Sequence, residues 1–272
     1  VSYIGSLEVP TYEWYINTIN TNTGGTAIAN TNTASYTPTA GTTQSTEYYY
    51  AKITLGTCAP KATAVFTINT LANPNITAQP VSPPAVCQNT TATALSVTAT
   101  SADASDLNYQ WYANTIDAAE NGIAINTAIS AEFTPSALVV GTLYYYAVVT
   151  QGTSGCTTTT TTAAVTVNPA LAATITPSTP QTVCEGEEVT LNVAELNGQG
   201  TASYQWYQNT TDVIPADSAT EIIAGEQNPN YTFTAATSTD STTTFYYAIV
   251  SYTGGSCQTV TSDLTAVVVN QN

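Results

Sequence analysis

Short runs in which apolar and polar residues alternate recur along the chain, and turn residues separate them. In the middle of the sequence such runs cover residues 94–99, 131–134, 143–150 and 163–167, with a loop at Asn121-Gly122. Successive side chains of a strand point to opposite faces, so this alternation predicts β-strands. No stretch of ten residues shows an apolar period near 3.6. The pattern predicts an all-β protein.

The chain contains an internal repeat with four landmarks. Trp14, Trp111 and Trp206 are separated by 97 and 95 residues. Each Trp lies in a Tyr-x-Trp-Tyr segment, at 12–15, 109–112 and 204–207, and an Asn follows three residues after the Trp, at Asn17, Asn114 and Asn209. An aromatic triplet comes next, at 48–50, 144–146 and 245–247. A cysteine follows each triplet: Cys58, Cys156 and Cys257. Recurrence of all four in register indicates three copies of one folding unit.

Each complete unit holds about seven short alternating strands in about 100 residues, which is typical of an immunoglobulin-like sandwich. The predicted fold is therefore all-β, with tandem immunoglobulin-like antiparallel β-sandwich repeats of about 95–100 residues forming an elongated rod. Such a unit is stabilised by its two inward faces, at roughly 25 cal/mol per Å² of buried apolar surface.

Proline-rich segments at 73–84 and 168–180 separate the units. Proline restricts the backbone, so we interpret these segments as semi-rigid joints; ordinary irregular loops are the alternative. The predicted domains are repeat 1 at residues 1–75, which is truncated at its N-terminal side, repeat 2 at 76–174 and repeat 3 at 175–272.

Composition removes several classes of partner. The net charge is −16, and Lys52 and Lys61 are the only cations. Such a surface repels phosphates and anionic headgroups, so we expect no nucleic-acid partner. No apolar run reaches the length of a membrane helix, so we expect no direct membrane insertion. Without an initiator Met or signal peptide at Val1, the sequence is expected to begin inside a processed or trimmed protein.

Five cysteines in an acidic, Thr-rich chain favour an oxidising, extracellular setting. Repeats 2 and 3 each hold two cysteines at similar spacing, which predicts the pairs Cys87–Cys156 and Cys184–Cys257. Cys58 is the only cysteine of repeat 1, and its partner is expected upstream of Val1. The alternative is that Cys58 is a reactive or intermolecular thiol.

The strand that carries the aromatic triplet can be assigned an inner face. Lys52 should point to water, so residues of the opposite parity should face the core. The residues expected inside are the central tyrosine of each triplet and the alanine two residues later: Tyr49, Tyr145 and Tyr246, with Ala51, Ala147 and Ala248. Val97 and Val193 are expected opposite them. Small apolar pairs would then replace the core disulfide of antibody domains, and the predicted disulfides would tie the first strand of each repeat to its last hairpin.

Sequence motifs for catalysis are missing. The chain has no His, no GxSxG segment, no P-loop and no zinc-type cysteine spacing, so we expect no enzymatic activity, metal or cofactor. Glu185, Glu187 and Glu188 follow Cys184 and resemble a solvated turn. Calcium is the one cofactor to consider; its candidate ligands are loop carboxylates, namely Glu185, Glu187, Asp103, Asp106 and Asp117. Solvated surface carboxylates are the favoured interpretation.

Aromatic residues on the outward parity of two strands form a candidate ligand-stacking surface. The candidates are Tyr112, Tyr144, Tyr146, Tyr207 and Tyr247. They could stack sugars, which would make the repeats a carbohydrate-binding module. The favoured alternative is cross-strand aromatic pairing that stabilises the sheet by roughly 0.2–1 kcal/mol per pair.

Taken together, these segments resemble the Ig-like repeats of Bacteroidetes cell-surface proteins, including the gliding-motility adhesin (SprB-type) family. The resemblance is carried by Cys-Glu-Gly at 184–186, Tyr-Gln-Trp-Tyr-Ala-Asn at 109–114, the segment 141–146, Gly155-Cys156 and Val-Asn-Pro at 167–169. It covers the whole chain and is specific to the repeat type. Repeat 1 departs from it in its front end, and repeat 2 has Gln88-Asn89 where the family has a glycine-containing turn.

The resemblance implies export by the type IX secretion system and display at the outer membrane surface. It also implies a structural or adhesive stalk in attachment or gliding, with other repeats of the chain, surface polysaccharide or the secretion and motility machinery as partners. Such bacteria are thought to O-glycosylate Asp-Ser/Thr-x sites, which implies candidate sites at Ser218 and Ser241.

Overall fold

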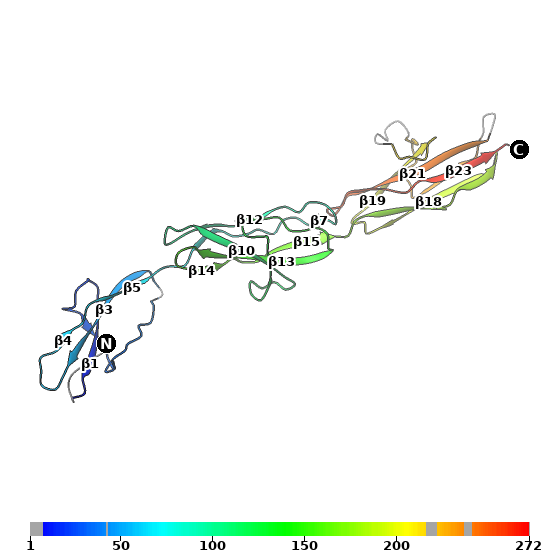
Figure 1. The fold of residues 1–272 in the computed structure, drawn as a ribbon. Helices are drawn as coiled ribbons and strands as arrows, with labels where there is room; N and C mark the ends of the chain where they lie inside the picture. The colour runs from blue at the N-terminus through cyan, green and yellow to red at the C-terminus, as the bar shows by residue number, and fades with distance from the viewer. Residues whose placement is uncertain (1–7, 42, 216–221, 237–240, 272) are drawn as a thin grey trace.

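The computed structural model describes residues 8–41, 43–215, 222–236 and 241–271. Figure 1 shows three bodies arranged end to end in an elongated molecule, each built from strands. The described residues form no helix, so none is available there to cross a membrane. The all-β prediction is confirmed.

The first body consists of one sheet in its described part. Its order is β2-β1-β3-β4, with β5 also paired to β3. The strands are β1 (Thr11–Asn17), β2 (Thr26–Ala27), β3 (Ser45–Thr54), β4 (Lys61–Ala62) and β5 (Phe66–Thr70).

The middle body has a larger sheet and two small ones. The larger sheet has the order β11-β10-β13-β15-β7, with β14 paired to β13; its strands are β7 (Val86–Cys87), β10 (Leu107–Asn114), β11 (Ile123–Ala124), β13 (Gly141–Gln151), β14 (Thr157–Thr159) and β15 (Ala163–Asn168). The small sheets pair β6 (Asn75–Ala78) with β9 (Thr98–Thr100), and β8 (Leu95–Ser96) with β12 (Glu132–Phe133).

The third body contains two sheets. One has the order β16-β18-β20, with β16 (Ala172–Thr176), β18 (Glu188–Leu196) and β20 (Asn230–Thr234). The other has the order β17-β23-β21-β19, with β22 paired to β21; its strands are β17 (Gln181–Cys184), β19 (Ala202–Asn209), β21 (Thr242–Tyr252), β22 (Thr259–Thr261) and β23 (Thr265–Asn270).

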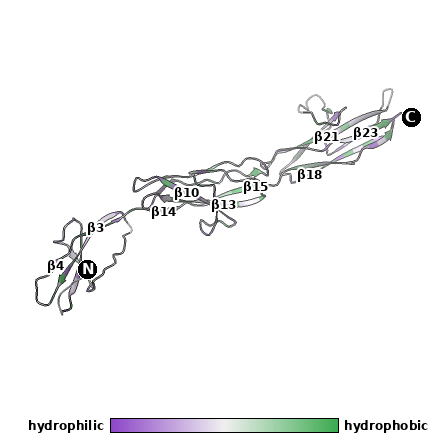
Figure 2. Ribbon diagram, in the orientation of Figure 1, coloured by the Kyte–Doolittle hydropathy of each residue, from purple (hydrophilic) through white to green (hydrophobic). Residues whose placement is uncertain are grey.

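Apolar side chains from both layers meet between the sheets. In the third body, Leu191 on β18 lies in one buried cluster with Trp206 on β19 and Val250 on β21. The middle body has a matching cluster around Trp111. Figure 2 shows both hydrophobic and hydrophilic stretches along the strands. Alternation explains the placement of the buried side chains, since every second residue of a strand such as β15 is buried.

The predicted strands and the residues expected to face inward agree with the structure. The runs predicted at 143–150 and 163–167 correspond to β13 and β15, while the run at 94–99 is divided between β8 and β9. The expected inward residues Tyr145, Ala147 and Val97 lie in the middle core together with Trp111. Lys52 points away from the core, with its Nζ 4.2 Å from the centre of the Tyr15 ring.

Candidate functional site at the joint between repeats

Cys87 lies at the C-terminal end of the middle body. It ends β7, which runs parallel to the last strand, β15, so that Cys87 stands opposite Asn168. The turn that follows is fixed by two backbone hydrogen bonds, from Gln88 N to Asn168 O at 2.8 Å and from Thr90 N to Cys87 O at 3.2 Å. The cysteine therefore faces the joint with the third body.

Cys257 faces the same joint from the other side. It lies in the turn between β21 and β22, which a hydrogen bond from Tyr252 N to Gln258 O closes at 2.8 Å. Cys87 and Cys257 form a disulfide with their Cα atoms 5.4 Å apart. Beside it, Asn168 Nδ2 donates a hydrogen bond to Ser256 Oγ at 3.0 Å. Repeats 2 and 3 are thus joined by a covalent bond in addition to the peptide linker.

This pairing corrects the predicted bridges Cys87–Cys156 and Cys184–Cys257. Within the middle body, β13 begins at Gly141, opposite Val167 and near Cys87, and ends at Gln151, near Cys156. Strands rise about 3.4 Å per residue, so the two cysteines lie roughly 30 Å apart, whereas disulfides require Cα atoms within about 7 Å.

The third body repeats this geometry and excludes its predicted bridge in the same way. Cys184 stands opposite Asn270 at the end of β17, at the edge of the sheet where β21 begins. Cys257 follows the other end of β21. The prediction failed because it placed each first cysteine beside the last hairpin, whereas the short parallel strand carries that cysteine to the opposite end of the sandwich.

Three cysteines are free thiols in the structure. Cys58 and Cys184 are exposed, and Cys156 is half-buried. The expected partner of Cys58, upstream of Val1, lies outside the described residues. Cys156 occupies the turn between β13 and β14, and its position in repeat 2 corresponds to that of Cys257 in repeat 3.

The joint between repeats 1 and 2 is held by hydrogen bonds. Gln151 is fully buried, and its Nε2 donates to Ala72 O at 3.1 Å. Its Oε1 accepts from Ala102 N at 2.5 Å, so one amide side chain connects the linker with a loop of repeat 2. Thr158 Oγ1 adds a bond to Pro74 O at 2.7 Å. These contacts restrict the linker, as expected for a semi-rigid joint.

The candidate stacking surface is largely occupied by its own aromatic rings. Tyr112 and Tyr146 stack with ring centres 5.1 Å apart, and Tyr207 and Tyr247 stack at 5.0 Å. Tyr146, Tyr207 and Tyr247 are buried, which corrects the expectation that they face solvent. Cross-strand pairing, the favoured alternative, is what the structure contains.

In repeats 1 and 2, the loop after the Trp strand covers the corresponding rings. Tyr146 Oη accepts a hydrogen bond from Gly122 N at 3.0 Å, and Tyr50 Oη accepts one from Gly25 N at 3.1 Å. Tyr112 and Tyr144 are half-buried. The candidate stacking surface is therefore less accessible to a ligand than the residue parity predicted.

The central tyrosines of the triplets are also withdrawn from water. Burial raises the pKa of Tyr246 to about 12, because the phenolate would lose its hydration. Burial, and then a hydrogen bond to Glu47, raises the pKa of Tyr49 to about 12. These hydroxyls stay protonated at neutral pH, and the two tyrosines are part of the buried core.

Two of the loop carboxylates considered for calcium, Asp103 and Glu187, accept hydrogen bonds. Asp103 accepts bonds from Ser101 Oγ at 2.6 Å and from Ser154 N at 3.1 Å. Glu187 accepts one from Cys184 N at 2.9 Å. Among the described residues, no group of three or more acidic or cysteine side chains is arranged to hold a metal ion. Whether calcium binds stays open as a prediction.

The two candidate glycosylation sites differ in what the structure describes. Ser218 lies outside the described residues. Ser241 is exposed, and its Oγ donates to Asn270 Oδ1 at 2.9 Å. Glycosylation of both stays a prediction, which intact-mass analysis of the native protein would test.

Comparison with known proteins places an immunoglobulin domain in the chain. Residues 172–268 match the family model described as immunoglobulin domain, and residues 78–169 match a model described as a domain of unknown function. No curated protein matches the chain.

Among solved structures, extracellular domains 3–5 of Drosophila OTK share 13% identity over 97% of this chain and 86% of that chain, with a TM-score of 0.38. Three N-terminal domains of the bacteriophage RB49 outer capsid protein Hoc share 16% over 97% and 88%, with a TM-score of 0.40. The titin fragment I67–I69 shares 9% over 97% and 87%, with a TM-score of 0.39. Together, the sheets described above and the matched immunoglobulin domain establish the chain as an all-β tandem array of immunoglobulin-like repeats.

Proposed function

We propose that this chain is a structural, load-bearing segment of the stalk of a secreted bacterial surface adhesin. The observation that carries the proposal is the Cys87–Cys257 disulfide, which joins two consecutive repeats rather than two strands of one repeat. A bridge across a joint limits bending and separation of neighbouring repeats. A stalk that transmits force benefits from that limit, whereas a freely hinged linker does not require it.

The second joint supports the same proposal. Gln151 and Thr158 reach the backbone of the preceding linker, so repeats 1 and 2 also meet through defined contacts. Immunoglobulin-like domains are generally non-enzymatic, and a disulfide between such domains is consistent with an extracellular protein. A structural or adhesive extracellular module is consistent with both.

We also propose that the chain lies at the cell surface and acts in attachment or gliding. Both parts of this proposal rest on the resemblance to Bacteroidetes surface repeats, and the partners would be the other repeats of the chain and the secretion or motility machinery. A carbohydrate-binding role for the tyrosine surface is less well supported, because Tyr146, Tyr207 and Tyr247 are buried.

Antibodies against the chain test the proposal on cells of its source organism. The proposal expects them to label intact cells, and expects external protease to remove the label. It also expects a strain lacking the segment to lose attachment or gliding under flow. Labelling that appears only after lysis, or an unchanged strain, would contradict it.

A further inference from the structure

A hollow of about 360 Å³ lies at the joint between repeats 2 and 3, beside the Cys87–Cys257 bond. Its lining comes from the turn after β7, from the linker and from the hairpin formed by β21 and β22. These segments contribute Gln88 and Thr90, Leu171, and Ser256, Gln258 and Thr259, respectively. No single repeat contains the whole lining, so the hollow depends on the joint being assembled.

The lining of this joint hollow combines amides and hydroxyls with aliphatic side chains. Among the lining residues, all of which lie in the described part of the chain, none is charged or aromatic. Amides and hydroxyls both donate and accept hydrogen bonds, and the half-buried Leu171 offers an apolar contact beside them. Such a lining fits a neutral ligand that carries hydroxyl groups of its own.

Three polar side chains of the hairpin retain hydrogen-bonding capacity for a ligand. Gln258 and Thr259 are exposed, and within the described residues their side chains make no hydrogen bond. Ser256 Oγ accepts a bond from Asn168 Nδ2 at 3.0 Å, while its own O–H reaches the weak acceptor Cys257 Sγ at 4.0 Å and can exchange that contact for a ligand. Because the disulfide anchors Cys257, all three groups are presented from one fixed turn.

The joint between repeats 1 and 2 uses the corresponding positions differently. There Gln151 and Thr158 donate hydrogen bonds to carbonyls of the linker. By strand register, Tyr252 and Val260 take these two positions in repeat 3, and neither donates to the linker among the described residues. The joint between repeats 2 and 3 is held by a covalent bond instead, which leaves the polar groups of its hairpin available to a ligand.

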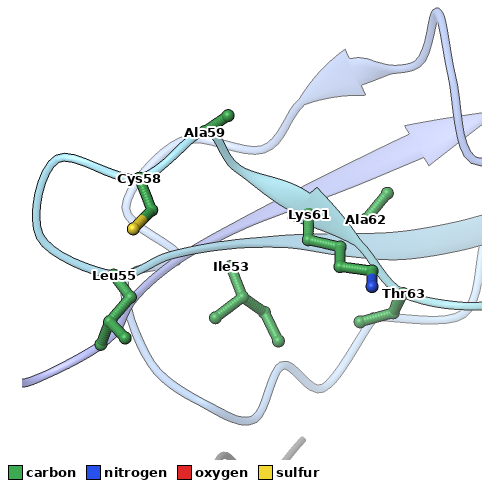
Figure 3. Close-up of a pocket in the computed structure, with 7 residues that line it drawn as sticks. All are labelled: Ile53, Leu55, Cys58, Ala59, Lys61, Ala62 and Thr63. Carbon is green, nitrogen blue, oxygen red and sulfur yellow. The ribbon is translucent and has the colours of Figure 1, made fainter. Parts of the chain in front are cut away.

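The hairpin of repeat 1 borders a hollow of similar size, about 370 Å³, with a different lining (Figure 3). Ile53, Leu55 and Ala62 give it mainly apolar walls, and Lys61 adds a positive charge. A neutral ligand rich in hydroxyls meets fewer hydrogen-bonding partners there. This second hollow therefore serves as a comparison site within the same molecule.

We propose that the joint hollow binds a neutral sugar, as a mono- or disaccharide unit of a glycan. Its volume lies near the lower end of the range for small-ligand pockets, about 300–1,000 Å³, which suits such a unit better than an extended peptide. The net charge of −16 disfavours anionic sugars. The proposal uses none of the tyrosines considered above, and it does not rest on the load-bearing role, since a sugar can occupy the joint whether or not the rod transmits force.

The test titrates the isotope-labelled full chain with methyl glycosides of glucose, galactose, mannose and N-acetylglucosamine at millimolar concentrations, followed by nuclear magnetic resonance. The backbone amides of Leu171 and Thr259 report binding at the joint. We expect at least one neutral glycoside to shift both signals, and the methyl glycoside of sialic acid to bind more weakly. N-acetylglycylglycine amide tests the peptide alternative, and tighter binding of this probe than of every glycoside would overturn the proposal.

Variants of the hollow locate the site. Gln258→Ala should weaken binding of the glycoside by about 2- to 12-fold, the effect of losing one hydrogen bond. Cys87→Ser should weaken it at least as much, because two walls of the hollow are no longer linked. Lys61→Ala changes the comparison site of Figure 3 and is the matched control, which should leave the affinity unchanged.

Far-ultraviolet circular dichroism equal to that of the parent chain would show that the variants are folded. The proposal is overturned if no neutral glycoside shifts the two joint signals, or if the shifts occur around Ile53 instead. Equal affinity for the sialic acid glycoside, or unchanged affinity in either Gln258→Ala or Cys87→Ser, would overturn it as well.

Discussion

Thr160 Oγ1 accepts a hydrogen bond from the backbone N–H of Ala147 at 2.9 Å, inside the middle repeat where both residues are buried. Ala147 follows the section of β13 that pairs with β15 and precedes the section that pairs with β14. The Thr160 hydroxyl therefore gives the Ala147 N–H an acceptor near the point where the partner strand of β13 changes from β15 to β14. The other repeats have the same arrangement, with Thr63 bonded to Ala51 at 3.0 Å and Ser262 bonded to Ala248 at 2.9 Å.

Replacing Thr160 tests this contact. Thr160→Val keeps the shape of the side chain but leaves the Ala147 N–H buried without its acceptor, which costs about 1–3 kcal/mol. We expect hydrogen exchange of the Ala147 amide to accelerate by the corresponding factor, roughly 5- to 150-fold.

Thr160→Ser is the matched control, because repeat 3 uses serine at this position. It retains the hydroxyl and should change the exchange rate of the Ala147 amide much less than the valine variant does. Equal rates in the two variants would show that the hydrogen bond contributes nothing to local stability.

The sequence predicted what depends on residue spacing. The facing of Tyr145 and Ala147 followed from parity along one strand, since a lysine expected to point to water, Lys52 at the equivalent position in repeat 1, determines which residues point inward. The recurring Trp also predicted the core, where each indole Nε1 donates to a carbonyl on a later segment, as Trp111 does to Ser130 O at 2.9 Å.

The sequence did not predict the position of Cys87, because that position depends on which sheet its strand joins. A short segment such as 86–87 fits either layer, and only its pairing with β15 places Cys87 at the joint. Similarly, parity placed Tyr146 on the outer face, but the burial of that face comes from the loop at Gly122, whose path the sequence does not specify. The Asn-Gly pair indicated a turn without indicating what it covers.

Gly122 is the residue that permits this cover. A Cβ added there would lie 2.9 Å from Tyr146 Cε1 and 3.0 Å from Ala113 O, which is closer than such atoms pack. We expect Gly122→Ala to lower the free energy of unfolding of repeat 2 by about 1–3 kcal/mol through overpacking. Calorimetry of the full chain would detect the shift as a lower-temperature transition for one repeat.

Gly41→Ala is the control for that substitution, since the nearest atom to its added Cβ is Thr43 O at 3.8 Å. Tyr146→Phe separates the hydrogen bond from the stacking, because it keeps the ring beside Tyr112 and removes the acceptor of the Gly122 N–H. It should cost about 0.5–1.5 kcal/mol. No change in either Gly122→Ala or Tyr146→Phe would mean that the loop does not hold the tyrosine pair.

Asp103 makes the loop before β10 sensitive to acid. Hydrogen bonds from Ser101 and Ser105, and from the Ser154 amide, hold the pKa of Asp103 well below its usual range. A group with a lowered folded-state pKa stabilises the fold above its unfolded-state pKa, about 3.9 for aspartate, and this contribution is lost as pH falls through the folded-state value. We expect amides of the β13–β14 turn to lose protection below about pH 4, measured by hydrogen exchange.

Asp103→Asn should remove most of this acid dependence and weaken the turn at neutral pH. Asp106→Asn removes the same charge from the same loop and serves as the control. If Asp106→Asn altered the acid dependence as much as Asp103→Asn, general charge repulsion rather than the Asp103 bonds would account for it.

The Cys87–Cys257 bond also determines which part of the chain can extend under force. When the two ends are pulled, tension passes from Cys87 directly to Cys257, and the enclosed segment, a sequence separation of 170, carries none of it. Reducing the bond should therefore add roughly 560–610 Å of contour length when repeats 2 and 3 unfold, at about 3.3–3.6 Å per residue.

Single-molecule force spectroscopy measures this difference. Cys87→Ser should show the longer extension without reductant, while Cys156→Ser should keep the shorter one. Equal lengths in the parent chain and Cys87→Ser would contradict the bond, because removal of a disulfide at Cys87 that shields repeats 2 and 3 must lengthen the unfolded chain.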